Sequence, residues 1–515
     1  MRPYHIRLLL SGALSLLFYL GVAWLSKEFN WGEGYSRRPI PEYLLLYGGL
    51  FVLYALAVYW TLKARPDARA LALILLLGLA FRAVLIPSNQ IQEDDVYRYL
   101  WDGKVFAHQV NPYKYSPDQV TFFKQFMIRE PSRFASTYDS SSVRELELLA
   151  ELKWSDERSL IFMERINHPD LPTIYPPMAQ YVFRLIHQAA PDSITALRLG
   201  FLIFDLIAAG FILLTLGHLG KNKTWVLIYF WSPLILKETF NSTHLDIIGI
   251  AFLTGAVYFL VKARFLTAHL FLAFSVLGKL YPAVLFPFIL KEEVRRRGVH
   301  AGRVAAAVAL FCGTLVVFYL PFLDIGKRVF SSLKSFGTYW QSNDSVFALL
   351  VWFYRDVAGI APKGPVDFSY DAPSLWAKIT VVLTLAGVWL FLFFKKETRD
   401  ARETADQAGS LVTVRHLFII MGLIFLLSPV QNPWYLCWVV PFLCFFPMRS
   451  WILLTGLVGL YYLGFYLDYQ ELNDRQDWIP WFEYLPFYLL LAWDLHRQRQ
   501  RKLRITGRAS VPEKS

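Results

Sequence analysis

Three consecutive carboxylates, Glu93, Asp94 and Asp95, follow an apolar segment that ends near Pro87. Carboxylates packed side by side repel one another, so the pKa of at least one of them is expected to rise. A carboxylate with a raised pKa at a membrane surface is suited to act as a general base or to bind a cation. The motif therefore predicts a functional site at the end of a membrane helix.

If residues 92–106 form a helix, Asp94, Arg98 and Asp102 lie on one face, because four-residue spacing follows the helical repeat. Arg98 could then hold one acid while a neighbouring acid stays free to accept a proton. The alternative is a solvated loop helix with internal ion pairs only. The adjacent bilayer and the surrounding apolar and aromatic residues favour a functional role over that alternative.

Two basic residues in apolar segments could bind a phosphate group. Lys279 interrupts the apolar run 265–290, and charges at such places usually face a cavity or a partner. The alternative for Lys279 is a side chain that extends to the lipid headgroups. Arg198, just inside the segment 193–217, could bind phosphate or anchor that helix at the interface.

His244 and Asp246 begin another apolar segment, where Asp246 could simply favour the helix dipole. Beside the acidic motif, this pair could instead bind sugar hydroxyls or a divalent cation, and His168 with Asp170 offers a similar pair. These spacings define no ligand count, so no metal is assigned and a divalent cation stays an open alternative.

Aromatic and amide side chains occur at or near the expected outer ends of several helices. These residues are Trp340, Asn343, Gln431, Trp434 and Tyr435. Aromatic faces stack on sugars and amides bind hydroxyls, but Trp and Tyr at helix ends also form the ordinary interfacial belt. With 17 tryptophans in the chain, the belt is the default for any single one.

The composition is that of an integral membrane protein that crosses the bilayer many times. The 515 residues are 55% hydrophobic and 17% aromatic, and apolar runs long enough to span a bilayer recur along the chain. The formal net charge of +12 comes from short basic clusters between these runs, which is the positive-inside pattern and indicates no nucleic-acid partner. All three cysteines lie in apolar runs, so neither disulfides nor a zinc site are expected.

The sequence predicts an all-α bundle of about 12–14 transmembrane helices, with both termini cytoplasmic. Expected spans are 6–26, 42–62, 70–87, 193–217, 225–240, 247–262, 302–321, 375–394, 411–427, 433–448, 451–467 and 481–495. Residues 265–290 should form two short helices that meet at the outer side, since one crossing would put a flanking basic cluster outside. The first segment has no small-residue cleavage site after it and is expected to be a retained anchor.

Three regions follow from this topology. Residues 1–69 would form two N-terminal helices, 70–495 the catalytic core, and 496–515 a basic cytoplasmic tail that lies unstructured against anionic lipid. The core carries one long outer loop, 88–192. Within it we expect a short helix at 143–154 and an interfacial helix at 178–190.

The order of several motifs resembles the GT-C superfamily of membrane glycosyltransferases, and within it the mannosyltransferases that depend on polyprenyl-phosphate mannose. The motifs are YRYLWDGK at 97–104, NPY at 111–113, YPP at 175–177, NSTHLD at 241–246, KLYP at 279–282, YWQSNDSVF at 339–347 and PWYL at 433–436. The resemblance covers about residues 70 to 448. The first two helices look like an addition before this core.

The resemblance implies a chemistry in which an acid in the first outer loop deprotonates the acceptor hydroxyl. By resemblance the sugar is mannose, and it would move from a polyprenyl phosphate with inversion, so that a β-linked donor gives an α-linked product. By position, Asp94 is the implied base and Asp95 the second choice; Lys279 or Arg198 would steady the phosphate. A slot between the helices near 193–290 would hold the lipid tail.

The residues expected to bind substrate combine these motifs with the analysis above. They are Glu93, Arg98, Tyr99, Asp102, His168, Tyr175, Arg198, His244, Asp246, Lys279, Tyr281, Trp340, Asn343, Gln431, Trp434 and Tyr435. The resemblance would place a His or similar residue before Pro-Trp-Tyr, where this chain has Gln431 and Asn432. The acceptor therefore stays open between a glycolipid, a polysaccharide and a protein.

Two other functions were weighed against the transferase. A transporter or flippase of lipid-linked sugars would suit the many helices and intramembrane charges, but such proteins often have repeated halves, which this sequence lacks. A cytoplasmic transferase that uses nucleotide sugars would need a phosphate-binding loop or a sizeable cytoplasmic domain, and the sequence has neither. The expected protein is a cytoplasmic-membrane enzyme with its active site on the outer face.

Overall fold

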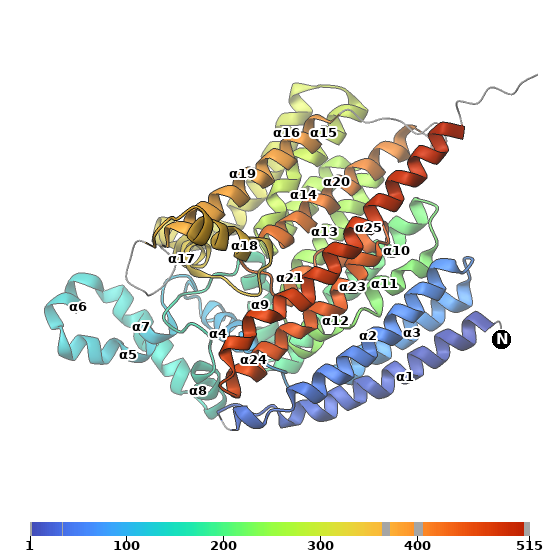
Figure 1. Ribbon diagram of the computed structural model, residues 1–515. Helices are drawn as coiled ribbons and strands as arrows, with labels where there is room; N and C mark the ends of the chain where they lie inside the picture. Colours follow the sequence, from blue (N-terminus) through green and yellow to red (C-terminus); the bar gives the residue numbers. More distant parts are fainter. Residues whose placement is uncertain (1–2, 33, 363–370, 396–404, 509–515) are drawn as a thin grey trace, which may run out of the picture.

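The computed structural model describes residues 3–32, 34–362, 371–395 and 405–508. About 80% of the residues are helical, and no β-strand occurs in these ranges. The long helices run side by side along one direction, and a lobe of shorter helices projects from one end of the bundle (Figure 1). The chain enters α1 and leaves α25 at the end opposite this lobe. The expected all-α, polytopic membrane architecture is confirmed.

Most of the expected spans are found within a few residues of their expected ends. They are α1 (Pro3–Leu25), α2 (Ile40–Lys63), α3 (Ala68–Leu85), α10 (Ile194–His218), α13 (Asp246–Val261), α16 (Ala301–Tyr319), α19 (Ala372–Phe394), α20 (Ala405–Leu427), α23 (Arg449–Leu457) with α24 (Tyr461–Tyr469), and α25 (Ile479–Arg508). In the described ranges, eight helical runs are long and apolar enough to cross a membrane.

Two expected spans, 225–240 and 433–448, are not continuous helices. The first is split into α11 (Leu227–Phe230), α12 (Pro233–Leu236) and the π-helical turn η4 (Lys237–Asn241). The second is split into α21 (Pro433–Leu436) and α22 (Val440–Leu443). Pro233 and Pro441 each begin a new helical turn, because proline lacks the backbone N–H that would continue the preceding one.

Both broken segments lie at the centre of the bundle, where nearly every side chain is buried. Non-helical backbone is tolerated at membrane depth only where protein, rather than lipid, surrounds it. The breaks therefore depend on the helices packed around them. Asn241 of η4 accepts from the amide of Ile91 over 3.1 Å, and Ser428, Asn432, Trp434 and Tyr435 line the cavity at the lobe end.

The expected helical hairpin at 265–290 is confirmed as α14 (Phe265–Gly278) and α15 (Phe286–Arg297), joined by the 3-10 turn η5 (Tyr281–Leu285). Arg297 donates to the carbonyl of Ala263 over 2.9 Å, so the two flanking basic clusters lie on the same side. A Cβ on Gly278 would stand 2.9 Å from the Cα of Gly249, which shows how closely α13 and α14 approach at the other end.

The long loop 88–192 forms the projecting lobe and the two helices beneath it. Its helices are α4 (Asp95–Ala107), α5 (Pro117–Arg129), α6 (Pro131–Thr137), α7 (Ser140–Trp154), α8 (Glu157–Glu164) and α9 (Pro177–Ala189). Side-chain caps fix the starts of α5 and α7: Ser116 and Gln119 form a capping box, and Asp139 accepts from the amide of Ser142. The expected helices at 143–154 and 178–190 are both present.

The segment between α16 and α19 also lies at the lobe end. It contains η6 (Leu320–Phe330), α17 (Ser331–Tyr339), α18 (Val346–Trp352) and η7 (Phe353–Val357). The tail differs from expectation: it is not unstructured after Arg497, because α25 continues to Arg508.

Candidate active site

A cavity of about 760 Å³ opens where the lobe meets the bundle. Its wall is built from the start of α4, residues 167–176, the junction 278–281, α17 and residues 428–435. Thirteen of the residues expected from the sequence line it: Glu93, Asp94, Asp95, Arg98, Tyr99, His168, Tyr175, Asp246, Lys279, Tyr281, Trp340, Trp434 and Tyr435. Side chains far apart in the sequence thus meet in one place.

The acidic motif occupies the N-terminus of α4, with Asp94 at the N-cap and Asp95 in the first turn. Free amides and the helix dipole favour negative charge there. Burial raises the pKa of Asp94 to about 6, although the charge of Arg38 acts in the opposite direction. Burial also raises the pKa of Glu93 well above its ordinary value. A raised pKa within the motif agrees with the sequence-based expectation.

Asp95 is held differently from Asp94, because it faces His244. The Oδ2 atom of Asp95 lies 3.6 Å from Nδ1 of His244, whose ring stacks on Trp434 at a centroid distance of 4.0 Å. Burial acts to raise the pKa of Asp95, but His244, Tyr175 and Lys279 together outweigh burial and hold the pKa below its ordinary value. Neighbouring carboxylates in one motif therefore differ in basicity.

Beneath His244 lies a buried polar cluster that sequence reasoning missed. Nε2 of His244 lies 3.4 Å from Glu238, and Glu238 accepts a hydrogen bond of 3.0 Å from the Tyr462 hydroxyl. Lys237 donates to that hydroxyl and, over 2.6 Å, to Ser242. One feature of the sequence could have predicted this cluster: the adjacent Lys237 and Glu238 lie inside the apolar run 225–240. Charged side chains in such runs usually have a partner.

Lys279 lines the cavity directly after the end of α14. Its ammonium is 2.6 Å from Oδ1 of Asp246, which also accepts from the indole N–H of Trp438 over 2.6 Å. The same ammonium stands 4.1 Å from the centre of the Tyr435 ring. These contacts hold a cation at the cavity wall, where an incoming phosphate oxygen could join Asp246 as its partner.

Arg198 is not brought into the cavity. Its buried guanidinium donates to the carbonyls of Ile86 (2.6 Å) and Asn241 (2.7 Å), to the Thr243 hydroxyl (3.0 Å) and to the carbonyl of Ser88. It thereby ties the end of α3 to the loop that carries His244. This is a positioning arrangement for the site.

The other expected residues that do not line this cavity have structural partners. Asp102 accepts from Gln180 over 3.3 Å, and burial raises its pKa to about 6 against the opposing charge of Arg98. Arg98, which does line the cavity, was expected to pair with one acid of the motif. Its side chain instead donates hydrogen bonds to the carbonyls of Asn167 and His168.

Gln431 and Asn343 support the far wall of the site. The Gln431 amide donates to the carbonyls of Leu426 and Ser428, both over 3.0 Å. Asn343 donates to Glu483 over 2.7 Å and lines a second cavity. The lining residues that were not expected from the sequence include the polar and aromatic residues Gln92, Asn432, Trp438 and Tyr461. Their aromatic and amide types are common throughout the apolar runs, so nothing local marks them.

No group of three or more His, Cys, Asp or Glu side chains among the described residues has the geometry to hold a metal ion. The cavity instead combines carboxylates, one paired ammonium and several aromatic rings. Such a set can accept a proton, neutralise an anion and stack on a sugar ring.

The fold and the cavity define a polytopic helical membrane protein with a polar cavity of acids, one lysine and aromatic rings. Residues 173–429 match the family model described as Glycosyltransferase family 87. The chain is a membrane glycosyltransferase, similar over these residues to that family. The match favours the transferase over the transporter.

The matched range includes Tyr175, Lys279 and Trp340 of the cavity and begins after the acidic motif. Comparison with curated protein sequences gave no match, and comparison with solved structures gave none either.

Proposed function

We propose that this protein transfers a sugar, in the first instance mannose, from a polyprenyl phosphate to a hydroxyl acceptor with inversion of configuration. The observation that carries the proposal is that Asp94, Asp95 and Lys279 line one cavity. A base and a cation on different walls of one cavity are what an inverting displacement of a phosphate requires.

Asp94 is the proposed base. A pKa of about 6 leaves its carboxylate mostly ionised at neutral pH, yet basic enough to accept a proton in the transition state. Asp95, whose pKa is low and which faces His244, is the weaker base and is assigned to binding the acceptor or the sugar.

The charged neighbours of the two acids support this division. Asp94 responds to the charges of Arg38 and Arg165, whereas Asp95 responds to His244 and Lys279. In an inverting displacement the base and the departing phosphate lie on opposite sides of the anomeric carbon. If the phosphate binds at Lys279, the base must lie on the other side of the sugar. Asp94 suits that position better than Asp95, because Lys279 influences the pKa of Asp95 but not that of Asp94.

In the proposed reaction, Asp94 takes the proton of the acceptor hydroxyl while the hydroxyl oxygen bonds to the anomeric carbon. The bond between that carbon and the phosphate oxygen breaks, and its electron pair departs with the polyprenyl phosphate. Lys279 neutralises the charge that grows on the phosphate, with Asp246 holding the ammonium in place. A β-linked donor would give an α-linked product.

We assign the site to the extracytoplasmic face of the membrane. Support comes from the basic residues 295–297 of α15, which lie at the end of the hairpin away from Lys279. Basic residues concentrate on the cytoplasmic side of membrane proteins. A lipid-phosphate donor also suits a compartment without nucleotide sugars.

The test uses purified protein reconstituted in sealed lipid vesicles with polyprenyl-phosphate mannose and a panel of hydroxyl acceptors. Sugar transfer and release of free polyprenyl phosphate are followed for wild type, Asp94→Asn and the exposed control Asp474→Asn. Loss of both signals in Asp94→Asn alone supports the transferase and its base. Full turnover in Asp94→Asn moves the base to Asp95 or Glu93. Movement of the donor lipid across the bilayer without transfer would replace the enzyme with a flippase.

A further inference from the structure

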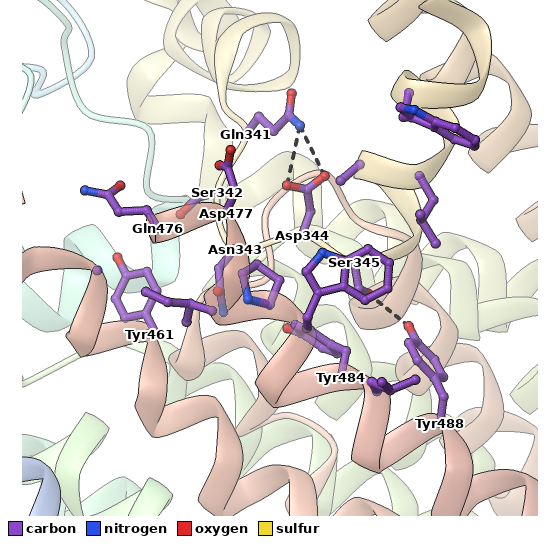
Figure 2. A pocket seen from close by; sticks show the side chains of 18 of the residues that line it. Gln341, Ser342, Asn343, Asp344, Ser345, Tyr461, Gln476, Asp477, Tyr484 and Tyr488 are labelled. Carbon is purple, nitrogen blue, oxygen red and sulfur yellow. Dashed lines mark hydrogen bonds between the residues drawn. The ribbon is translucent and has the colours of Figure 1, made fainter. Parts of the chain in front are cut away.

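A second cavity of about 1170 Å³ adjoins the acidic one. It lies between residues 341–345, α18, α24 and the start of α25 (Figure 2). Four residues line both cavities: Gln341, Ser342, Tyr461 and Phe465. The partition between them is therefore thin.

Residues 341–342 form one part of this partition, and Tyr461 and Phe465 of α24 form another. The amide of Ser342 donates to the carbonyl of Pro429, and the amide of Gln431 donates to the carbonyl of Ser342, both over 2.9 Å. These two bonds attach the partition to the loop before α21 at a single isolated bridge. A ligand seated in the second cavity would thus have its polar end beside the acidic motif.

The inner end of the second cavity is polar. Gln341 donates to Asp344 at 3.2 and 3.4 Å, and Ser345 lies 2.9 Å from the Tyr488 hydroxyl, as Figure 2 shows. Tyr484 is 2% exposed, and its hydroxyl has no hydrogen-bond partner within the described part of the chain. Buried hydroxyls are normally paired, so this one is suited to a ligand group. Burial also raises the pKa of Asp344 to about 6.

The outer end of the same cavity is apolar and faces outward. Leu349 and Trp352 of α18 are 46% and 52% exposed, and Trp481 and Leu485 of α25 are 49% and 50% exposed. Further along α25, Leu489 and Trp493 are also exposed. Large exposed apolar side chains on a membrane protein are suited to contact hydrocarbon. The apolar side of the cavity, between α18 and the start of α25, could therefore admit a hydrocarbon chain.

The charge of the residues that line the second cavity indicates which substrate it binds, the polyprenyl-phosphate donor or a lipid-linked acceptor. The described residues that line this cavity include Asp344, Asp468 and Asp477 but no Lys, Arg or His. A lipid phosphate would meet only repulsion there. An uncharged saccharide would find carboxylates, amides and aromatic rings, which together bind sugar hydroxyls and sugar faces.

We propose that this second cavity binds the acceptor, and that the acceptor is an uncharged saccharide carried on a lipid. The saccharide lies against Gln341, Asp344 and Tyr484 and reaches past the partition, while the hydrocarbon chain leaves between α18 and α25. This rests on the proposed transferase function and narrows its acceptor from three classes to glycolipids.

Two variants test the proposal. Leu485→Trp narrows the opening at an exposed position, and Leu489→Trp, on the same exposed side of α25 but outside the cavity lining, is its matched control. Tyr484→Phe removes a hydroxyl that has no partner among the described residues, so its removal should cost no folding stability. A loss of acceptor affinity in Tyr484→Phe would then show that the Tyr484 hydroxyl contacts the acceptor.

The acceptors are a series of alkyl mannosides from methyl to octyl, with polyprenyl-phosphate mannose as donor. In wild type the acceptor KM should fall by up to about fourfold for each methylene that becomes buried. In Leu485→Trp this dependence on chain length should be lost, with the donor KM unchanged, whereas Leu489→Trp should match wild type. Tyr484→Phe should raise the acceptor KM several-fold at every chain length.

A second readout does not depend on turnover. An alkyl mannoside with a photoreactive group in its chain should crosslink to α18 or the start of α25, and Leu485→Trp should reduce the yield. Transfer with a KM independent of chain length, or crosslinks confined to residues 193–290, would overturn this acceptor site and leave the transferase standing. Crosslinking at α18 and α25 without transfer to any acceptor would instead count against the proposed function.

Discussion

The ammonium of Lys279 lies 2.6 Å from the carboxylate of Asp246, at the point where α13 begins and α14 ends. The close approach of Gly249 and Gly278 permits this pairing, since a Cβ on Gly278 would collide with the other backbone. The lysine thus directly follows the last residue of α14 and is paired with the first residue of α13, so two packed helices fix its position. Sites built on such elements hold their geometry more tightly than loop sites do.

Lys279→Met should lower kcat/KM for the donor by about a hundredfold or more, because the phosphate would lose its cation at the moment charge develops. Lys279→Arg should retain part of the activity. Initial rates at varied donor concentration measure both effects. If Lys279→Met keeps wild-type kinetics while Asp94→Asn is inactive, the phosphate must be held elsewhere.

The pH dependence of kcat/KM should follow the ionisation of Asp94. Its pKa is raised to about 6 in the folded protein, and only the ionised form accepts a proton, so activity should fall as pH drops below about 6. Asp94→Asn should reduce the rate by about a hundred- to ten-thousandfold and abolish this acid limb. An unchanged acid limb in a partly active Asp94→Asn would assign the titration to another group.

His244→Phe keeps an aromatic ring for stacking on Trp434 but removes the nitrogen that faces Asp95. The pKa of Asp95 should then rise, because burial would be opposed only by Tyr175 and Lys279. We expect kcat to fall by up to about a hundredfold through misplacement of the substrate, with the acid limb that Asp94 sets retained. His244→Ala serves as the comparison, because it removes both the contact with Asp95 and the stacking on Trp434. If His244→Phe has the same kcat as wild type, only the stacking on Trp434 contributes to activity.

Arg198→Met should destabilise the protein more than it alters the chemistry. Its guanidinium satisfies carbonyls at both the end of α3 and the loop 241–243, and these would be left buried without a partner. The cost should be about 2–4 kcal/mol in the free energy of unfolding. Thermal unfolding in nanodiscs measures it, with Lys279→Met as the comparison. A stable Arg198→Met that has lost donor binding would return Arg198 to the phosphate site.

The sequence predicted the long helices because apolar runs of about twenty residues have few alternatives in a bilayer. It also predicted that the acidic motif and Lys279 would face one site, since both stand where charge is costly without a partner. It did not predict the breaks in 225–240 and 433–448. Burial by neighbouring helices makes those breaks tolerable, and single-sequence periodicity contains no record of neighbours.

The same limit explains the mixed outcome for the basic residues. Arg198 and Lys279 look alike in the sequence, as single cations in apolar segments. In the structure one is surrounded by backbone carbonyls and the other faces a cavity. The difference arises from which loops pack against each helix, and local sequence does not encode that.

The broken segment at 225–241 also constrains how the chain can enter a membrane. Each charge of Lys237 and Glu238 would cost about 2.5–3.5 kcal/mol at the centre of an isolated inserted segment. Their partners include Ile91, Ser242 and His244 as well as Tyr462, which lies far along the chain. The two charges therefore reach their full set of partners only after α24 has been inserted, which makes completion of this polar cluster a late event in biogenesis.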